Sequence, residues 1–382
     1  MFTAPPPATF RHPLLLLFPA ALLAIGCHKY PASRADSVLA TEQPRHTFVG
    51  NAGSATSVCF SPDGTCVASS HTEPPGTSDM PGEKPSGAPD TRHPLRGLKI
   101  WNANTGALRR SLSNGLLIHA LAFYPDGKRL AGSEAGIVKV WDAATGQELL
   151  VIRGHHDVVR ALSVSSDGER LLTGSSDGTV KVWDATTGAH IGTITRPPGM
   201  YNVAFSRDGK QVAITGRSDD AKAEICIWDV IRRRELVRMT HDSVIHGAIF
   251  SPDGRRVASF GGEATKITKP GLVEVWELPS GRLLFARQGH SREVTCLDYS
   301  PDGRRLASGS EDGTVVIWDA TTGIQLANFA AHVREGDRYP NIQGLAFSPD
   351  GNELATASWD GSVKIWDVKD ANSNKETNKR TP

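Results

Sequence analysis

A five-residue turn recurs seven times along this 382-residue chain, and each copy is followed by a tryptophan before the next copy begins. The turns read Phe-Ser-Pro-Asp-Gly or a variant, at 60–64, 123–127, 164–168, 205–209, 250–254, 299–303 and 347–351. The tryptophans are Trp101, Trp141, Trp183, Trp228, Trp276, Trp318 and Trp366, at intervals of 40–48 residues. A repeat of this length, built from short apolar runs, predicts a radial array of small sheets.

One repeat shows how each sheet arises. The turn at 300–303 has Pro, Asp and Gly in the positions that a type I turn favours. Apolar runs at 294–299, 305–308, 314–318 and 325–329 read as four short strands. One such sheet cannot bury both of its faces, so neighbouring sheets must stack around an axis.

The repeats also resemble a known family. Gly-His at 154–155 and 289–290, the Ser-Pro-Asp-Gly turns, the Ser-x-Asp-Gly turns and the Trp-Asp pairs are similar to those of the WD-repeat family of β-propellers. The resemblance spans 45–367 and implies an all-β fold, a seven-bladed β-propeller of four-stranded antiparallel blades. The last copy has only three strands, so 45–49 is expected to supply its outer strand and close the ring. We therefore predict a single propeller domain at 45–368.

The resemblance further implies a buried hydrogen-bond network in each complete blade, formed by histidine, a hydroxyl, an aspartate and the tryptophan. Three blades have the full set: His155, Thr173, Asp177 and Trp183; His290, Ser308, Asp312 and Trp318; His332, Thr356, Asp360 and Trp366. Blade five has His241, Ser259 and Trp276 but no aspartate in its turn. A fully satisfied network is expected to rigidify its blade.

This recurrence favours a structural role over a hydrolase triad, because a nucleophile occurs once and needs an exposed site. No zinc-protease, serine-hydrolase or phosphate-loop motif is present, and the histidines lack chelating spacing. His119 and His246 occupy equivalent positions on roughly opposite sides of the axis, which gives little support for a shared metal. We expect a non-enzyme without cofactor or metal.

Charge gives no indication of a nucleic-acid partner. The chain has 42 Lys and Arg against 41 Asp and Glu, so it carries no general basic field. The basic run at 232–234 is interpreted as a solvated turn.

The N-terminus predicts export. Residues 1–26 have the features of a signal peptide, because an uncharged run at 13–26 is too short to span a bilayer. The run ends Leu-Ala-Ile-Gly-Cys, which resembles the lipobox of bacterial lipoproteins and implies acylation of Cys27 in the cell envelope. A soluble secreted or periplasmic product is the alternative. Residues 27–44 are expected to be a tether and 369–382 a disordered tail.

The four remaining cysteines show no metal-binding spacing. Cys59 and Cys66 flank the first turn on adjacent strands, so a disulfide is conceivable in an oxidising compartment. Two separate core thiols are the favoured interpretation.

Loop lengths locate the candidate recognition face. The connections before the first strands and between the second and third strands carry the large insertions, including a Pro-rich one at 71–97, whereas the opposite face is uniform. Residues expected at the variable face are Trp359, Tyr201, Arg160, His119, His246, Gln343 and Glu311, with Thr56, Thr295 and Ser176. Trp359 is the one tryptophan outside the third-strand series.

We therefore expect a membrane-tethered, monomeric scaffold that binds other proteins through this face. One alternative is a ligand-binding or hydrolytic propeller that uses the central channel. Another is a scaffold lipoprotein for envelope assembly. The fold alone does not choose between them.

Overall fold

The computed structural model describes residues 38–40, 43–49, 53–72, 97–112, 118–195, 202–217, 222–241, 244–262, 270–334, 336 and 339–370. These residues form 29 strands and all belong to one compact unit, 36–382. They include no helix that is long and apolar enough to cross a membrane. The signal peptide at 1–26, Cys27, residues 73–96 of the insertion and residues 371–382 of the tail lie outside the described residues.

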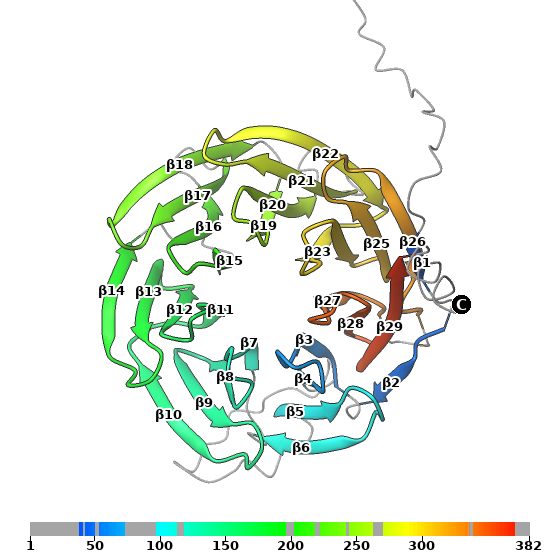
Figure 1. The fold of residues 1–382 in the computed structure, drawn as a ribbon, viewed down its shortest axis with the longest axis horizontal. Helices are drawn as coiled ribbons and strands as arrows, with labels where there is room; N and C mark the ends of the chain where they lie inside the picture. Colours follow the sequence, from blue (N-terminus) through cyan, green and yellow to red (C-terminus); the bar gives the residue numbers. More distant parts are fainter. Residues whose placement is uncertain are drawn as a thin grey trace, which may run out of the picture. The chain divides into compact units, whose positions relative to one another are not determined.

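The strands form seven antiparallel sheets around a central axis (Figure 1). Blade one contains β3 (Ala55–Phe60), β4 (Cys66–His71), β5 (Gly97–Asn102) and β6 (Leu108–Leu112). Blade two contains β7 (Ile118–Phe123), β8 (Arg129–Glu134), β9 (Ile137–Asp142) and β10 (Glu148–Arg153). Blade three contains β11 (Val159–Val164), β12 (Arg170–Ser175), β13 (Thr179–Asp184) and β14 (His190–Thr195). Blade four contains β15 (Asn202–Phe205), β16 (Gln211–Arg217), β17 (Ala223–Asp229) and β18 (Arg234–His241).

The remaining blades complete the ring. Blade five contains β19 (Val244–Phe250), β20 (Arg256–Gly262), β21 (Gly271–Glu277) and β22 (Arg282–His290). Blade six contains β23 (Val294–Tyr299), β24 (Arg305–Ser310), β25 (Thr314–Asp319) and β26 (Gln325–Ala330). Blade seven contains β27 (Ile342–Phe347), β28 (Glu353–Ser358) and β29 (Ser362–Asp370), joined by β2 (His46–Val49) and β1 (Val38–Ala40). The all-β, seven-bladed propeller predicted from the repeats is confirmed.

The repeated turns are held by their own aspartates. In blade six, Ser300 Oγ donates to Asp302 Oδ1 at 2.6 Å, and the Arg304 amide donates to the same oxygen at 3.0 Å. Gly303 follows with φ of 71°, a left-handed conformation that glycine adopts without steric cost. The side chain of the aspartate thus replaces water as the acceptor for the backbone that reverses here.

The core consists of seven apolar clusters, one between each pair of neighbouring blades. Between blades one and two, for example, Leu112 of β6 and Ile118 of β7 pack with Trp141 of β9. No blade buries its faces alone, so each blade depends on its two neighbours.

The two ends of the chain close the ring together. β2 pairs antiparallel with β29, with Phe48 opposite Val363. Phe48 is buried, and its ring stacks on Trp101 of blade one with centroids 5.2 Å apart. The prediction that residues 45–49 complete the last blade is confirmed.

β1 was not predicted. It lies within the segment interpreted as a tether and pairs with the end of β29, with Val38 opposite Asp370. β29 itself runs two residues past the predicted boundary at 368. The chain is therefore tied to blade seven at two successive places before it enters blade one.

Candidate interaction face and the networks that support it

Blade three contains a continuous chain of hydrogen bonds. Trp183 Nε1 donates to Thr173 Oγ1 at 2.8 Å, and Thr173 Oγ1 lies 2.7 Å from His155 Nε2. His155 Nδ1 lies 2.9 Å from Asp177 Oδ2. Because a carboxylate accepts only, Nδ1 carries the proton and Nε2 accepts from the threonine hydroxyl. Each polar group in the chain is thereby satisfied with a neutral imidazole.

Burial and hydrogen bonding shift the pKa values of His155 and Asp177 so that the histidine is neutral and the aspartate is charged. Burial lowers the pKa of His155, and Asp177 only partly offsets that effect. Burial alone raises the pKa of Asp177, but bonds from Thr179, His156 and His155 together hold that pKa well below its usual range. The resting network is therefore a neutral histidine beside a charged aspartate.

Blade seven repeats the arrangement. His332 lies 2.7 Å from Asp360 through Nδ1 and 2.8 Å from Thr356 through Nε2, while Trp366 Nε1 donates to Thr356 at 3.1 Å. Burial lowers the pKa of His332.

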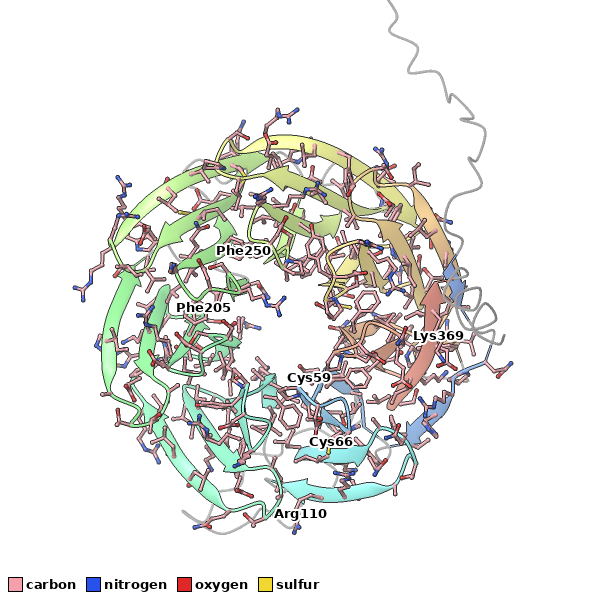
Figure 2. The ribbon with its side chains drawn as sticks, in the orientation of Figure 1. Cys59, Cys66, Arg110, Phe205, Phe250 and Lys369 are labelled. Carbon is pink, nitrogen blue, oxygen red and sulfur yellow. The ribbon has the colours of Figure 1, made fainter. Side chains whose placement is uncertain are left out.

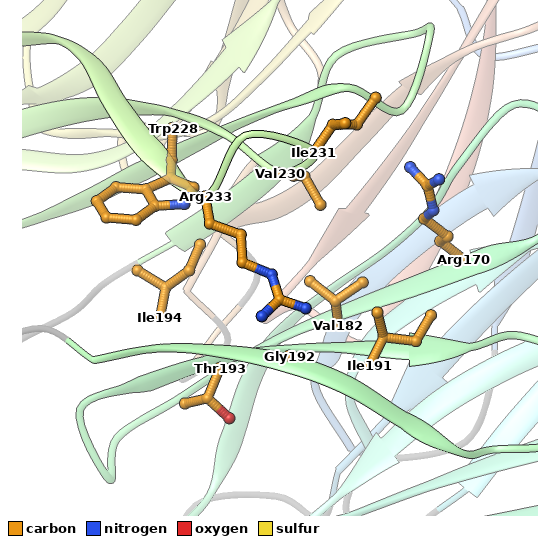
Figure 3. Close-up of a pocket in the computed structure, with 10 residues that line it drawn as sticks. All are labelled: Arg170, Val182, Ile191, Gly192, Thr193, Ile194, Trp228, Val230, Ile231 and Arg233. Carbon is orange, nitrogen blue, oxygen red and sulfur yellow. The ribbon is translucent and has the colours of Figure 1, made fainter.

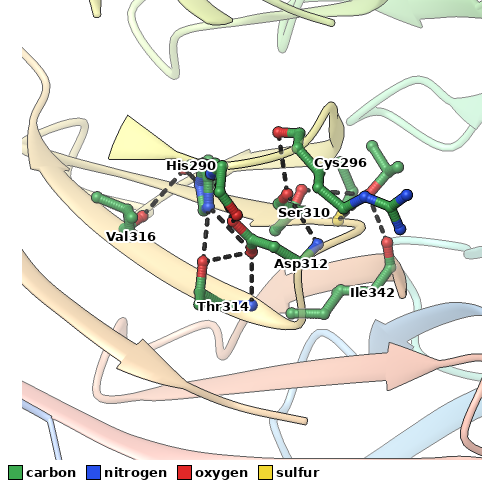
Figure 4. Close-up of polar contacts among 12 residues, drawn as sticks. His290, Cys296, Ser310, Asp312, Thr314, Val316 and Ile342 are labelled. Atoms are coloured by element: carbon green, nitrogen blue, oxygen red, sulfur yellow. Dashed lines mark hydrogen bonds and ion pairs between the residues drawn. The ribbon is translucent and has the colours of Figure 1, made fainter. Parts of the chain in front are cut away.

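Blade six uses the same residues with one change (Figure 4). Trp318 Nε1 donates to Ser308 Oγ at 2.9 Å, which lies 2.7 Å from His290 Nε2. His290 Nδ1 is 2.8 Å from Thr314 Oγ1 but 3.6 Å from Asp312 Oδ1. The Thr314 hydroxyl therefore makes the shorter contact with the imidazole, and it donates to Asp312 at 2.6 Å.

Blade five obtains its carboxylate from a different strand. Glu274 on β21 lies 3.1 Å from His241 Nε2 and accepts from Ser259 at 3.3 Å, while Trp276 Nε1 donates to Ser259 at 3.0 Å. Burial raises the pKa of Glu274, and His241 opposes that shift. The missing turn aspartate is thus replaced by a buried glutamate from the third strand.

Blade one has a fourth variant. Its histidine is His71, from the end of β4, and His71 Nε2 lies 2.8 Å from Ser69 Oγ, which accepts from Trp101 at 2.8 Å. His71 Nδ1 is buried without a hydrogen-bond partner. Burial, aided by Lys99, lowers the pKa of His71 to about 3.

The hydroxyl groups of these networks are unsuited to catalysis. Thr173, Ser308 and Thr356 are fully buried, and each accepts a bond from an indole. A nucleophile must reach its substrate and an oxyanion site, which none of these side chains can do.

The face formed by the connections between second and third strands carries the predicted contact residues. Arg160 is exposed, and its Nε donates to Ser176 at 2.7 Å. His119 is half-buried, and both burial and Arg160 lower its pKa. His246 pairs with Glu293 at 2.8 Å across blades five and six. Thr56, Thr295, Gln343 and Glu311 are half-buried, and Tyr201 lies outside the described residues.

Trp359 is the largest exposed apolar side chain at this face among the described residues. It is 45% exposed, although its backbone is fixed by bonds to Asn341 O at 2.9 Å and from Ser54 Oγ at 3.3 Å. The segment leading to Asn341 adds Tyr339, which is 47% exposed and lies under the Arg334 guanidinium at 4.9 Å. Aromatic groups with a nearby arginine are typical of protein-binding hot spots. Sequence reasoning missed Tyr339, although this residue lies in the connection before the first strand of blade seven, and such connections had been assigned to this face.

Comparison with known proteins places these features in a family. The model of the WD domain, G-beta repeat, matches residues 42–73, 107–142, 146–184, 281–319 and 323–367. The chain belongs to the WD-repeat family. A WD repeat-containing protein WDS homolog from Arabidopsis thaliana is 31% identical over 58% of this chain and 42% of its own length. A U3 small nucleolar RNA-associated protein 15 homolog from Xenopus tropicalis is 37% identical over 20% of this chain and 15% of its own length. This WD-repeat chain therefore spans less than half of these relatives.

The cysteines of this WD-repeat protein are free thiols in the described residues. Figure 2 shows Cys59 near the centre of the disc and Cys66 farther towards the rim. Strand register places Ala68, not Cys66, opposite Cys59. Cys59 packs against the apolar cluster between blades one and two, and burial raises its pKa to about 12.

No group of three metal-ligating side chains occurs in the described part of the WD-repeat disc. WD-repeat propellers are generally non-enzymatic, and the buried networks are consistent with a purely structural use of their polar residues.

Proposed function

We propose that this protein is a membrane-tethered scaffold that binds a partner protein through the face bearing Trp359. The observation that carries the proposal is an exposed tryptophan in a tight turn where the equivalent positions in blades three and six have Ser176 and Glu311. A rigid aromatic on a fixed backbone supplies contact area with little loss of conformational entropy. That backbone is held by its bonds to Asn341 O and from Ser54 Oγ.

Replacing Trp359 by alanine is expected to weaken partner binding by about 2 kcal/mol or more, the usual cost of truncating a hot spot. A photo-crosslinking amino acid at position 359 would capture the partner in envelope fractions, and titration would then compare its affinity for wild type and Trp359→Ala. Leu108→Ala is the matched control, because Leu108 is 50% exposed on the outer strand of blade one. Equal affinities for wild type and Trp359→Ala would place the site elsewhere.

Membrane attachment through Cys27 is supported by the lipobox-like sequence. Ten residues lie between Cys27 and Val38, so a fully extended chain would place them at most about 40 Å apart.

Cys27→Ser is expected to move the protein from the membrane fraction to the soluble fraction, or to leave the signal peptide uncleaved, because the acyl chains supply the anchoring energy. Radiolabelled palmitate would label wild type and the control Cys66→Ser but not Cys27→Ser. If wild type and Cys27→Ser fractionate alike and neither takes up label, the protein is not a lipoprotein.

A further inference from the structure

A repeated contact fixes the spacing between blades at the outer edge of the disc. In five blades the turn after the third strand ends in a glycine that packs against side chains of the preceding blade's outer strand. A Cβ at Gly146 would lie 2.7 Å from Leu112, and a Cβ at Gly188 would lie 3.2 Å from Leu150. The turn glycines of the described blades, with φ of 68–80°, are Gly106, Gly146, Gly188, Gly281 and Gly323. These junctions leave little or no room for a turn side chain.

Blade four departs from this pattern in both partners of the contact. Arg233 occupies the turn position with φ of 53°, a left-handed conformation that is costly for a residue with a Cβ. The outer strand that it faces, β14, has Gly192 at the position where neighbouring blades carry Arg110, Leu150, Val237, Phe285 and Ala327. No atom lies within 4 Å of a Cβ built on Gly192. At this junction the glycine is on the outer strand and the larger residue is in the turn, the reverse of the other junctions. Open space therefore remains beside Gly192.

That space is a pocket of about 250 Å³ between blades three and four (Figure 3). Its apolar lining includes Val182, Ile191, Ile194, Val230 and Ile231. Trp228 also lines it and is only half-buried, whereas the other six third-strand tryptophans are 2–6% exposed. Among the described residues, Trp228 Nε1 has no hydrogen-bond partner, because Ile214 stands where complete blades have a hydroxyl.

The pocket is also positively charged. Arg170 and Arg233 both line it, and no carboxylate does. Arg170 makes one long bond, from Nη1 to Gly209 O at 3.4 Å, and the Arg233 guanidinium has no ion pair within the described ranges. Glu235, the nearest acidic residue to Arg233 in the sequence, pairs with Arg238 at 2.6 Å. Asp229 accepts from the Ile231 and Arg232 amides and pairs with Arg232 at 3.0 Å. Arg170 and Arg233 thus border an apolar floor that no carboxylate lines, while Asp167, outside the lining, interacts with Arg170 through charge.

We propose that this pocket binds a short extended segment of a partner protein in which an apolar side chain is flanked by carboxylates. The apolar side chain would pack on Ile194 and the Trp228 ring, and the carboxylates would pair with Arg170 and Arg233. Guanidinium groups bind carboxylates with bidentate geometry, so an acidic flank is favoured over a neutral one. A strained backbone and an uncovered tryptophan at one junction reduce stability without a packing gain, which is typical of sites kept for binding.

The site is independent of the Trp359 face. In an antiparallel blade the turn after the third strand lies at the opposite end from the turn before it, so Arg233 and Trp359 belong to opposite faces of the disc. The family model also leaves residues 185–280 unmatched, which include all of blade four.

The test uses variants that the other junctions show to be compatible with the fold. Arg233→Gly restores the turn residue of its neighbours, and Gly192→Leu fills the open space. The double variant rebuilds the junction between blades two and three, where Gly188 faces Leu150. All three are expected to melt at or above the wild-type temperature, because strain or exposed apolar surface is removed.

Random twelve-residue peptides displayed on phage are selected on the purified full chain, and the enriched peptides are titrated by fluorescence polarisation. We expect enrichment of an apolar residue flanked by Asp or Glu, and at least tenfold weaker binding to Arg233→Gly and to Gly192→Leu. Trp359→Ala should leave this affinity unchanged. Failure to enrich any peptide, enrichment of basic or uncharged sequences, or equal binding to wild type and the double variant would overturn the proposal.

Discussion

Asp312→Ala is expected to lower the free energy of unfolding by about 2–3 kcal/mol, because several donors, those of Thr314 partly buried, lose their acceptor at once. The carboxylate accepts from the Thr314 amide at 2.9 Å, from the Thr314 hydroxyl at 2.6 Å and from the Ser291 amide at 2.7 Å. The side chain is 11% exposed, so water can replace only part of these bonds. In thermal denaturation the melting temperature should fall by roughly 3–5 °C.

Two further variants make the measurement specific. Glu311→Ala changes the neighbouring residue of the same turn, whose side chain makes no bond within the described residues, and should alter stability by less than about 0.5 kcal/mol. Asp312→Asn retains one acceptor oxygen and should fall between wild type and alanine. If Asp312→Ala and Glu311→Ala melted at the same temperature, the turn aspartate would not support blade six.

The fold could be predicted from the sequence because each repeat contains the residue patterns of its own turns and strands. Seven copies of one pattern leave a single consistent arrangement, and the incomplete last copy identifies the residues that must close the ring. β1 could not be predicted in this way. It has three residues, Val38–Ala40, and no turn signal, and its strand conformation depends entirely on pairing with the end of β29.

The networks were predictable only where the residues keep their repeat positions. Glu274 reaches His241 from the third strand, and His71 comes from the end of the second strand. Neither position belongs to the repeat pattern. In blade five the carboxylate, and in blade one the imidazole, comes from a different strand but lies beside the hydroxyl that bonds the tryptophan. Only the register between strands reveals such substitutions.

The pocket beside Arg233 could not be predicted from the sequence for a different reason. The sequence shows three arginines at 232–234, and a solvated turn is the ordinary interpretation of such a run. Arg232 and Arg234 are compatible with that interpretation, and Arg233 is the exception. Arg233 gains its significance from its backbone conformation and from Gly192 on another blade, and both are tertiary facts.

The disc is expected to lose stability steadily as the pH falls from 7 to 4. His71 has a folded-state pKa of about 3 because of burial and Lys99, against about 6.5 for an unfolded histidine. Burial also lowers the pKa of His155 and His332. A histidine whose pKa is depressed by folding binds its proton first in the unfolded chain. Its contribution to stability is therefore present above about pH 6.5 and is lost as the pH falls towards the folded value.

The network aspartates act in the same direction at lower pH. The folded-state pKa values of Asp177, Asp312 and Asp360 are depressed, mainly by hydrogen bonds that outweigh burial. Their contribution is present above the unfolded value of about 4 and is lost below it. Histidines should thus dominate the loss between pH 6.5 and 4, and aspartates should add to it below pH 4.

Urea denaturation at pH 4, 5, 6 and 7 and constant ionic strength would separate His71 from the other groups. His71 alone should account for about 2 kcal/mol of the loss between pH 6 and pH 4, since one proton per molecule corresponds to about 1.4 kcal/mol per pH unit. His71→Gln keeps a polar group near Ser69 but cannot take up a proton, so its stability should depend less steeply on pH over this interval. His190→Gln, at an exposed histidine of β14, is the matched control and should follow wild type. An unchanged slope in His71→Gln would show that this imidazole is not held neutral by burial, and that the fourth network variant does not make the disc sensitive to acid.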